Sequence, residues 1–139
     1  MMTEAGDERG SVLPLGIGYA LLALAVVLVC INATSLHLSQ KRLESLADAA
    51  ALAAADGFRV APTASGIGIE LDEHSARRQA EEVITISPVD AHLVSVTAHG
   101  GNSARVTVRA TWDSFLLSVF VPAGVDLEAT ATSRASLSG

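Results

Sequence analysis

Four histidines are the side chains of this sequence best suited to hold a metal ion. They stand at His37, His74, His92 and His99, without the H-E-x-x-H pattern and without the paired spacing of metal ligands. His92 and His99 bracket one expected strand, so they should lie at its opposite ends. We therefore expect no shared metal site.

Other polar groups also lack the context of an active site. Glu81 and Glu82 follow Arg77 and Arg78 at helical spacing, which indicates a solvated face with ion pairs rather than an acid–base pair. Ser114 stands outside any G-x-S-x-G motif. We expect no enzyme, no small-molecule substrate and no cofactor.

Composition indicates a membrane protein rather than a nucleic-acid-binding one. The net charge is −6, so a basic surface for nucleic acid is absent. Half of the 139 residues are hydrophobic, and the mean hydropathy is +0.42, as in single-pass membrane proteins. The only cysteine, Cys30, lies within the apolar run, so no intrachain disulfide can form.

An uncharged segment runs from Gly10 to Leu36, and its most apolar part is "LPLGIGYALLALAVVLVCI". This part has about the length needed to cross a hydrocarbon core of ~30 Å, so we predict a transmembrane helix. A cleaved secretory signal is the rival interpretation. It fits less well, because the preceding residues "MMTEAGDERG" are acidic and the run exceeds the usual ~7–15 apolar residues.

The charges beside the span do not settle its orientation. Arg9 precedes the span, and Lys41 and Arg42 follow it, which slightly favours an N-terminus outside the cell. The Thr- and Ser-rich alternating segments of the C-terminal half favour the opposite orientation, with that half exported.

The helix is expected to continue beyond the membrane, because neither Gly nor Pro occurs between Tyr19 and Asp56. Gly57 is expected to end it in the left-handed conformation. Small and apolar residues recur at three- and four-residue steps and predict a narrow packing face. That face covers the chain's own C-terminal domain or packs against other helices, and both can hold in one molecule. Its members are Leu43, Leu46, Ala47, Ala50, Ala53 and Ala54.

The C-terminal half combines one helical and several β signals. Residues 58–71 contain Pro62, Gly66 and Gly68 and are interpreted as a loop or linker. Asp72 is a candidate N-cap of a short helix that ends at Ser87-Pro88. "AHLVSVTAH" and "ARVTVRATW" flank "GGNS" and predict a hairpin, and "VDLEATATSRAS" alternates again. The apolar run "SFLLSVFVP" fits a buried strand or a short helix.

Residues 8–57 resemble the N-terminal region of the TadE/TadG-like Flp (tight adherence) pilus-assembly proteins. The resemblance lies in Arg9-Gly10, the apolar span, the charged turn Lys41-Arg42-Leu43 and the run "ADAAALAAA" from Ala47. It implies a single-pass component of the Tad secretion system in the inner membrane. Its N-terminus would be cytoplasmic and its C-terminal domain extracytoplasmic. The implied partners are the lipid bilayer and other Tad pilus-assembly proteins or pilin-like helices.

The resemblance also implies a candidate processing site between Gly10 and Ser11, where a prepilin-type peptidase would cut. Pilins and the TadE branch carry Glu at the fifth position after that site, and here the position is Leu15, preceded by Pro14. This departure favours the TadG branch. Two alternatives stay open: a minor pilin incorporated in the fibre after cleavage at Gly10, and an anchored extracytoplasmic binding domain unrelated to pili.

The expected fold is α+β: a long N-terminal transmembrane helix that continues as a stalk, then a small antiparallel sheet with one or two packed helices. The expected divisions are a short tail over 1–10, the span over 11–35, the Ala-rich stalk over 36–57 and the α+β domain over 58–139.

Overall fold

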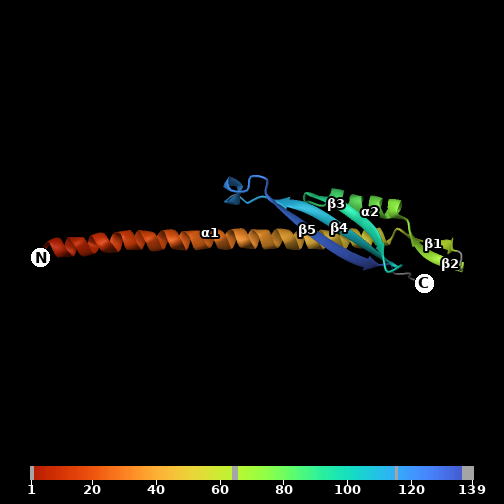
Figure 1. The fold of residues 1–139 in the computed structure, drawn as a ribbon, viewed down its shortest axis with the longest axis horizontal. Helices are drawn as coiled ribbons and strands as arrows, with labels where there is room; N and C mark the ends of the chain where they lie inside the picture. Colours follow the sequence, from red (N-terminus) through yellow and green to blue (C-terminus); the bar gives the residue numbers. More distant parts are fainter. Residues whose placement is uncertain (1, 64–65, 115, 136–139) are drawn as a thin grey trace. The chain divides into compact units, whose positions relative to one another are not determined.

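The computed structural model describes residues 2–63, 66–114 and 116–135. They form an α+β fold, as expected, and divide into two compact units between Leu36 and His37 (Figure 1). The elements follow one another as α1 (Met2–Ala55), β1 (Phe58–Thr63), β2 (Gly66–Leu71), α2 (Glu73–Ile86), β3 (Ala91–His99), β4 (Ser103–Trp112), the 3-10 helix η1 (Leu117–Val119) and β5 (Val125–Arg134).

The first unit is the apolar half of α1. Large apolar side chains from Val12 to Ile31 are exposed all around the helix, and its most apolar window has a mean hydropathy of 2.5. This helix is long and apolar enough to cross a membrane. Pro14 lies inside α1, well past its first turn, so one backbone hydrogen bond of the helix is missing at this position.

The second unit begins with the other half of α1 and contains the sheet. Its sheet is antiparallel in the order β3-β4-β5, and the turn between β3 and β4 contains Gly100 and Gly101, both with positive φ. The predicted hairpin is therefore confirmed. In β4 the apolar residues Val106 and Val108 are fully buried, whereas Arg105 and Arg109 point to the exposed face.

One face of the sheet is the core face. Cross-strand pairs on it join Val106 to Ala131 and Val108 to Ala129. The same core contains Leu43 and Ala47 of α1, both 0% exposed, and the Gln40 Nε2 atom donates to the Glu128 carbonyl of β5 at 3.2 Å. The C-terminal half of α1 is thus packed on the sheet and is part of the domain.

The opposite face of the sheet carries polar cross-strand pairs. Thr107 and Thr130 share a hydrogen bond of 2.9 Å between their hydroxyls. Arg109 Nη2 lies 2.8 Å from Glu128 Oε2, and this hydrogen bond raises the pKa of Arg109. These pairs align β4 with β5 on a solvated face.

Helix α2 follows its sequence signals. The Asp72 side chain accepts a hydrogen bond from the Ser75 N–H at 3.3 Å, and Ser87 ends the helix. Its buried side includes Ala76, Ala80 and Ile84. The N-cap and the end of this helix are therefore confirmed.

The interpretation of residues 58–71 as a loop or linker is wrong. They form a separate two-stranded antiparallel hairpin in which Phe58 pairs with Leu71 and Thr63 with Gly66. Pro62 is compatible with it, because both strands of a two-stranded ribbon are edges and a missing ladder N–H is tolerated there.

Gly57 does not have the left-handed conformation that the sequence predicted, since its φ is not positive. Its role is close approach. A Cβ atom at this position would lie 2.9 Å from the backbone N and Cα of Ala76 in α2. A larger residue would push α2 away from the end of α1.

The packing of α1 on the sheet predicts unequal effects for two leucines of the same helix. Leu43 is 0% exposed and Leu52 is 62% exposed. Leu43→Ala should lower the free energy of unfolding by about 2–5 kcal/mol, and Leu52→Ala should change it by less than about 0.5 kcal/mol. Urea unfolding of the detergent-solubilised full chain, followed through the single buried Trp112, measures both. Equal losses would contradict this packing.

Candidate assembly surfaces

The predicted packing face of α1 lies inside the second unit. Leu43, Leu46, Ala47, Ala50 and Ala54 are buried, and Ala53 is half-buried beside them. Two further residues that the sequence analysis did not include, Ala51 and Ala55, are also buried. These side chains cover the chain's own sheet, so in this conformation they are not accessible to a second helix.

The other side of the same helix segment is exposed and of mixed polarity. At its start, Lys41 Nζ lies 2.8 Å from Glu44 Oε2. This hydrogen bond raises the pKa of Lys41 and lowers the pKa of Glu44. The pair is solvent-exposed, so its contribution to stability is small. Further along, the exposed residues are Ser45, Asp48, Ala49 and Leu52.

The apolar half of α1 offers a second surface. Gly16 has no heavy atom within 4 Å of a Cβ built on it, and Cys30 is exposed. Small residues on such a helix permit close contact with another helix. Gly10 and Ser11, the candidate processing site, lie within α1, and processing there stays a prediction.

A shallow pocket of about 260 Å³ lies within the second unit, between α1 and one end of the sheet. Its lining includes Arg42 from α1, Asp90 before β3, and Trp112 and Asp113 at the end of β4. Cation and carboxylates are mixed here with apolar groups. The arrangement does not resemble a nucleophile with its base.

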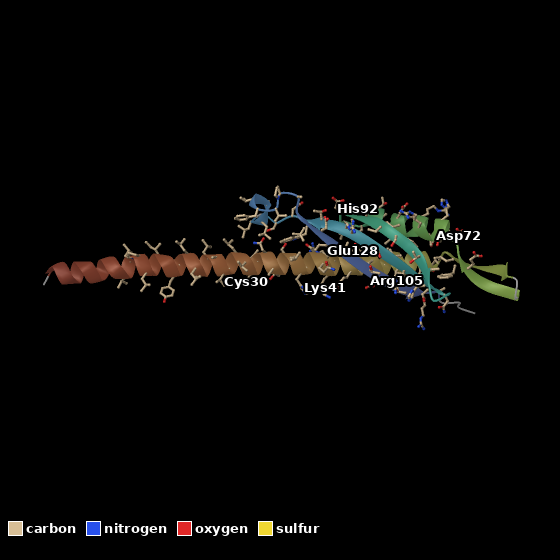
Figure 2. All side chains as sticks on the ribbon, viewed as in Figure 1. Cys30, Lys41, Asp72, His92, Arg105 and Glu128 are labelled. Carbon is tan, nitrogen blue, oxygen red and sulfur yellow. The ribbon has the colours of Figure 1, made fainter. Side chains whose placement is uncertain are left out.

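The histidines are spread over three elements of the described chain. His37 lies on α1 and His74 on α2, while β3 carries His92 and His99 near its two ends. Figure 2 labels His92 on β3. The His99 Nε2 atom lies 3.2 Å from Arg105 Nη2. Over the described residues, no group of three His, Cys, Asp or Glu side chains could hold a metal ion.

Family comparison identifies the N-terminal part of the chain. Residues 10–57 match the model of the TadE/G-like Flp pilus-assembly family. The predicted resemblance is confirmed, and the match does not separate the TadE and TadG branches. The chain matches no curated protein and no solved structure.

The TadE/G-like match covers α1 from Gly10 to its end at Ala55 and stops at Gly57, directly before β1. It therefore joins two surfaces of different chemistry: an apolar helix exposed all around, and an Ala-rich face buried on the sheet. The sheet itself lies outside the matched residues.

One exposed apolar surface was not predicted. The run "SFLLSVFVP" was expected to be a buried strand or a short helix, and it contains the short helix η1 over Leu117–Val119. No residue of η1 is buried, and Val119 and the following Phe120 are 80% and 81% exposed. The absence of charged residues in this run is the sequence feature that could have indicated an exposed apolar surface. It does not distinguish the two cases, because charge-free segments are typical of buried cores as well as of exposed contact surfaces.

The burial of the alanines predicts the result of enlarging them. Ala50→Leu together with Ala54→Leu should overpack the core of the second unit and lower its free energy of unfolding by about 1–3 kcal/mol per site. Ala49→Leu, on the exposed side, is the matched control and should change stability little. Urea unfolding of the isolated full-length protein measures this effect. Unchanged stability combined with lost pilus assembly would show instead that the face serves another helix.

Proposed function

We propose that the protein is a single-pass inner-membrane component of a Flp/Tad-type pilus-assembly and secretion system. Its involvement in Flp pilus assembly is supported by the family match over residues 10–57. The single-pass role is supported by an apolar helix whose large side chains have no partner within the described chain. The protein acts through contacts with lipid, helices and other proteins rather than through catalysis.

In this proposal residues 11–35 span the bilayer and residues 1–10 form a short cytoplasmic tail. The stalk over 36–57 and the α+β domain over 58–139 lie outside the cytoplasm. The orientation rests on the family resemblance and on the strand-rich polar domain, against the weak bias of Lys41 and Arg42. The stalk and the sheet form one compact unit that starts at His37, so both would be exported together.

The proposed partners are other Tad proteins or pilin-like helices. Within the membrane, close helix contacts would use the small residues Gly16, Ala20 and Ala23 of the exposed span. Outside it, the solvated face of β4 and β5 offers the Thr107–Thr130 and Arg109–Glu128 pairs to a partner. The buried Ala-rich face would act indirectly, by holding this domain to the helix.

A minor pilin is the second candidate function, favoured by Gly10 and Ser11 at the head of the apolar run. Leu15 and Pro14 depart from the pilin pattern after that site. For this reason we place the protein among the permanent assembly components.

The mass of the protein recovered from native membranes distinguishes these two functions. We expect an intact N-terminus, because Leu15 replaces the pilin Glu. Loss of residues 1–10, together with the protein's presence in sheared pili, would overturn the permanent-component proposal and establish a minor pilin. A Leu15→Glu variant tests the reason: it should become a better substrate of the peptidase.

Orientation and pathway are tested in cells. In a Cys30→Ser background, Asn102→Cys in the β3–β4 turn should react with a maleimide that cannot cross the inner membrane, and Thr3→Cys should not. Deletion of the gene should abolish pili, and the wild-type chain should restore them. Full piliation after deletion would favour an anchored binding domain unrelated to pili.

A further inference from the structure

The described residues of the β4–β5 loop, 113–114 and 116–124, carry a cluster of exposed apolar side chains in the second unit. Val119 and Phe120 are 80% and 81% exposed, and Leu117 and Val121 are 41% and 42% exposed. No charged residue occurs between Asp113 and Asp126. An exposed cluster of this kind marks a contact with a protein or with lipid.

Five backbone N–H groups of the loop, those of Leu117, Ser118, Phe120, Val121 and Gly124, donate hydrogen bonds within the loop. The Ser114 Oγ accepts from the Leu117 N–H at 3.2 Å. The Ser114 carbonyl accepts from Ser118, the Leu117 carbonyl accepts from Phe120 and Val121, and the Val121 carbonyl accepts from Gly124. Apolar side chains can therefore leave water without stranding these N–H groups, which is the main requirement on backbone that enters a lipid phase.

The base of the loop is closed tightly. Gly124 has a φ of +75°, and a Cβ there would collide with the Asp113 carboxylate and lie 2.7 Å from Thr111 Cγ2. The loop is thus a formed turn held at the end of β4, rather than an extended linker. Its apolar tip, Val119-Phe120, is presented by this turn.

The loop lies at the end of the second unit where the chain arrives from the span. Ser39 and Arg42 of α1 line the same pocket as Trp112 and Asp113, the residues that lead into the loop. Ser39 follows Leu36 by three residues, which is about 5 Å along a helix axis. The β3–β4 turn, with Asn102, lies at the other end of β4 (Figure 1).

We infer that the β4–β5 loop inserts its apolar tip into the membrane surface beside the span. This inference rests on the proposed membrane span, because only the span brings lipid to this end of the domain. Lipid is the occupant favoured over a protein, since the loop is next to Ser39 and Arg42, close to the residue at which the second unit begins and the apolar run ends in the sequence. The insertion would give the domain a second attachment to the bilayer.

The charges near the loop indicate how it would bind. Lys41 and Arg42 are accompanied by Asp90, Asp113 and Asp126 at this end of the domain. This mixture gives little attraction to anionic lipid. Contact should therefore depend on the apolar side chains and change little with salt or with anionic lipid content.

Fluorescence quenching in nanodiscs of phosphatidylcholine tests the inference with the full chain. An environment-sensitive dye is attached at native Cys30, or at Phe120→Cys or Asn102→Cys in a Cys30→Ser background, and spin-labelled lipids serve as quenchers. Quenching by lipids labelled near the headgroup should be on the order of threefold stronger at position 120 than at 102, because interfacial side chains reach only ~5–10 Å into the bilayer. Val119→Asp should reduce the quenching at position 120. Trp112 fluorescence of the unlabelled variants checks that each is folded.

The label at Cys30 tests the membrane span separately from the insertion of the loop. Quenching at Cys30 by chain-labelled lipids but none at 120, or equal quenching at 120 and 102, would overturn the loop insertion and leave the span in place. No quenching at Cys30 would overturn the proposed membrane span and the loop insertion with it. A loop protected in cells but not quenched by lipid would mark a protein contact and would also overturn the inference.

Discussion

The second unit depends on the burial of the Ala- and Leu-rich side of α1 against the sheet. A three-stranded sheet with one 14-residue helix offers little apolar area of its own. Leu43 and Ala47 supply part of the missing cover, opposite Val106 and Val108 of β4. The segment that leaves the apolar run is therefore a central element of the domain, and the compact unit begins at His37 rather than after the helix.

This constraint explains why the helix is so rich in alanine. Alanine combines the highest helix propensity with a short side chain, which lets a sheet approach closely. The same composition is typical of helix–helix contacts, so the sequence left two partners open for this face. Which partner occupies it depends on residues more than fifty positions away in β4 and β5, and only the structure shows that the chain's own sheet does.

Elements with a regular period and clear end signals could be predicted from the sequence. The long helix, the Asp72 cap and the alternating strands β4 and β5 are examples. The hairpin over residues 58–71 was missed because Pro and Gly obscure alternation, although both are tolerated in a two-stranded ribbon. Gly57 shows a second reason why sequence alone is insufficient. A side chain at this position would collide with Ala76 of α2, and the sequence around Gly57 does not show that α2 lies there.

The burial of one face of α1 limits where assembly contacts can form. Since the Ala-rich face is used internally, a partner must contact the apolar span, the exposed outer side of the stalk or the surfaces of the domain. The TadE/G-like match covers both the apolar part and the Ala-rich part of α1. One continuous helix, α1, therefore joins an apolar segment that is exposed all around to a segment that is packed into a folded domain.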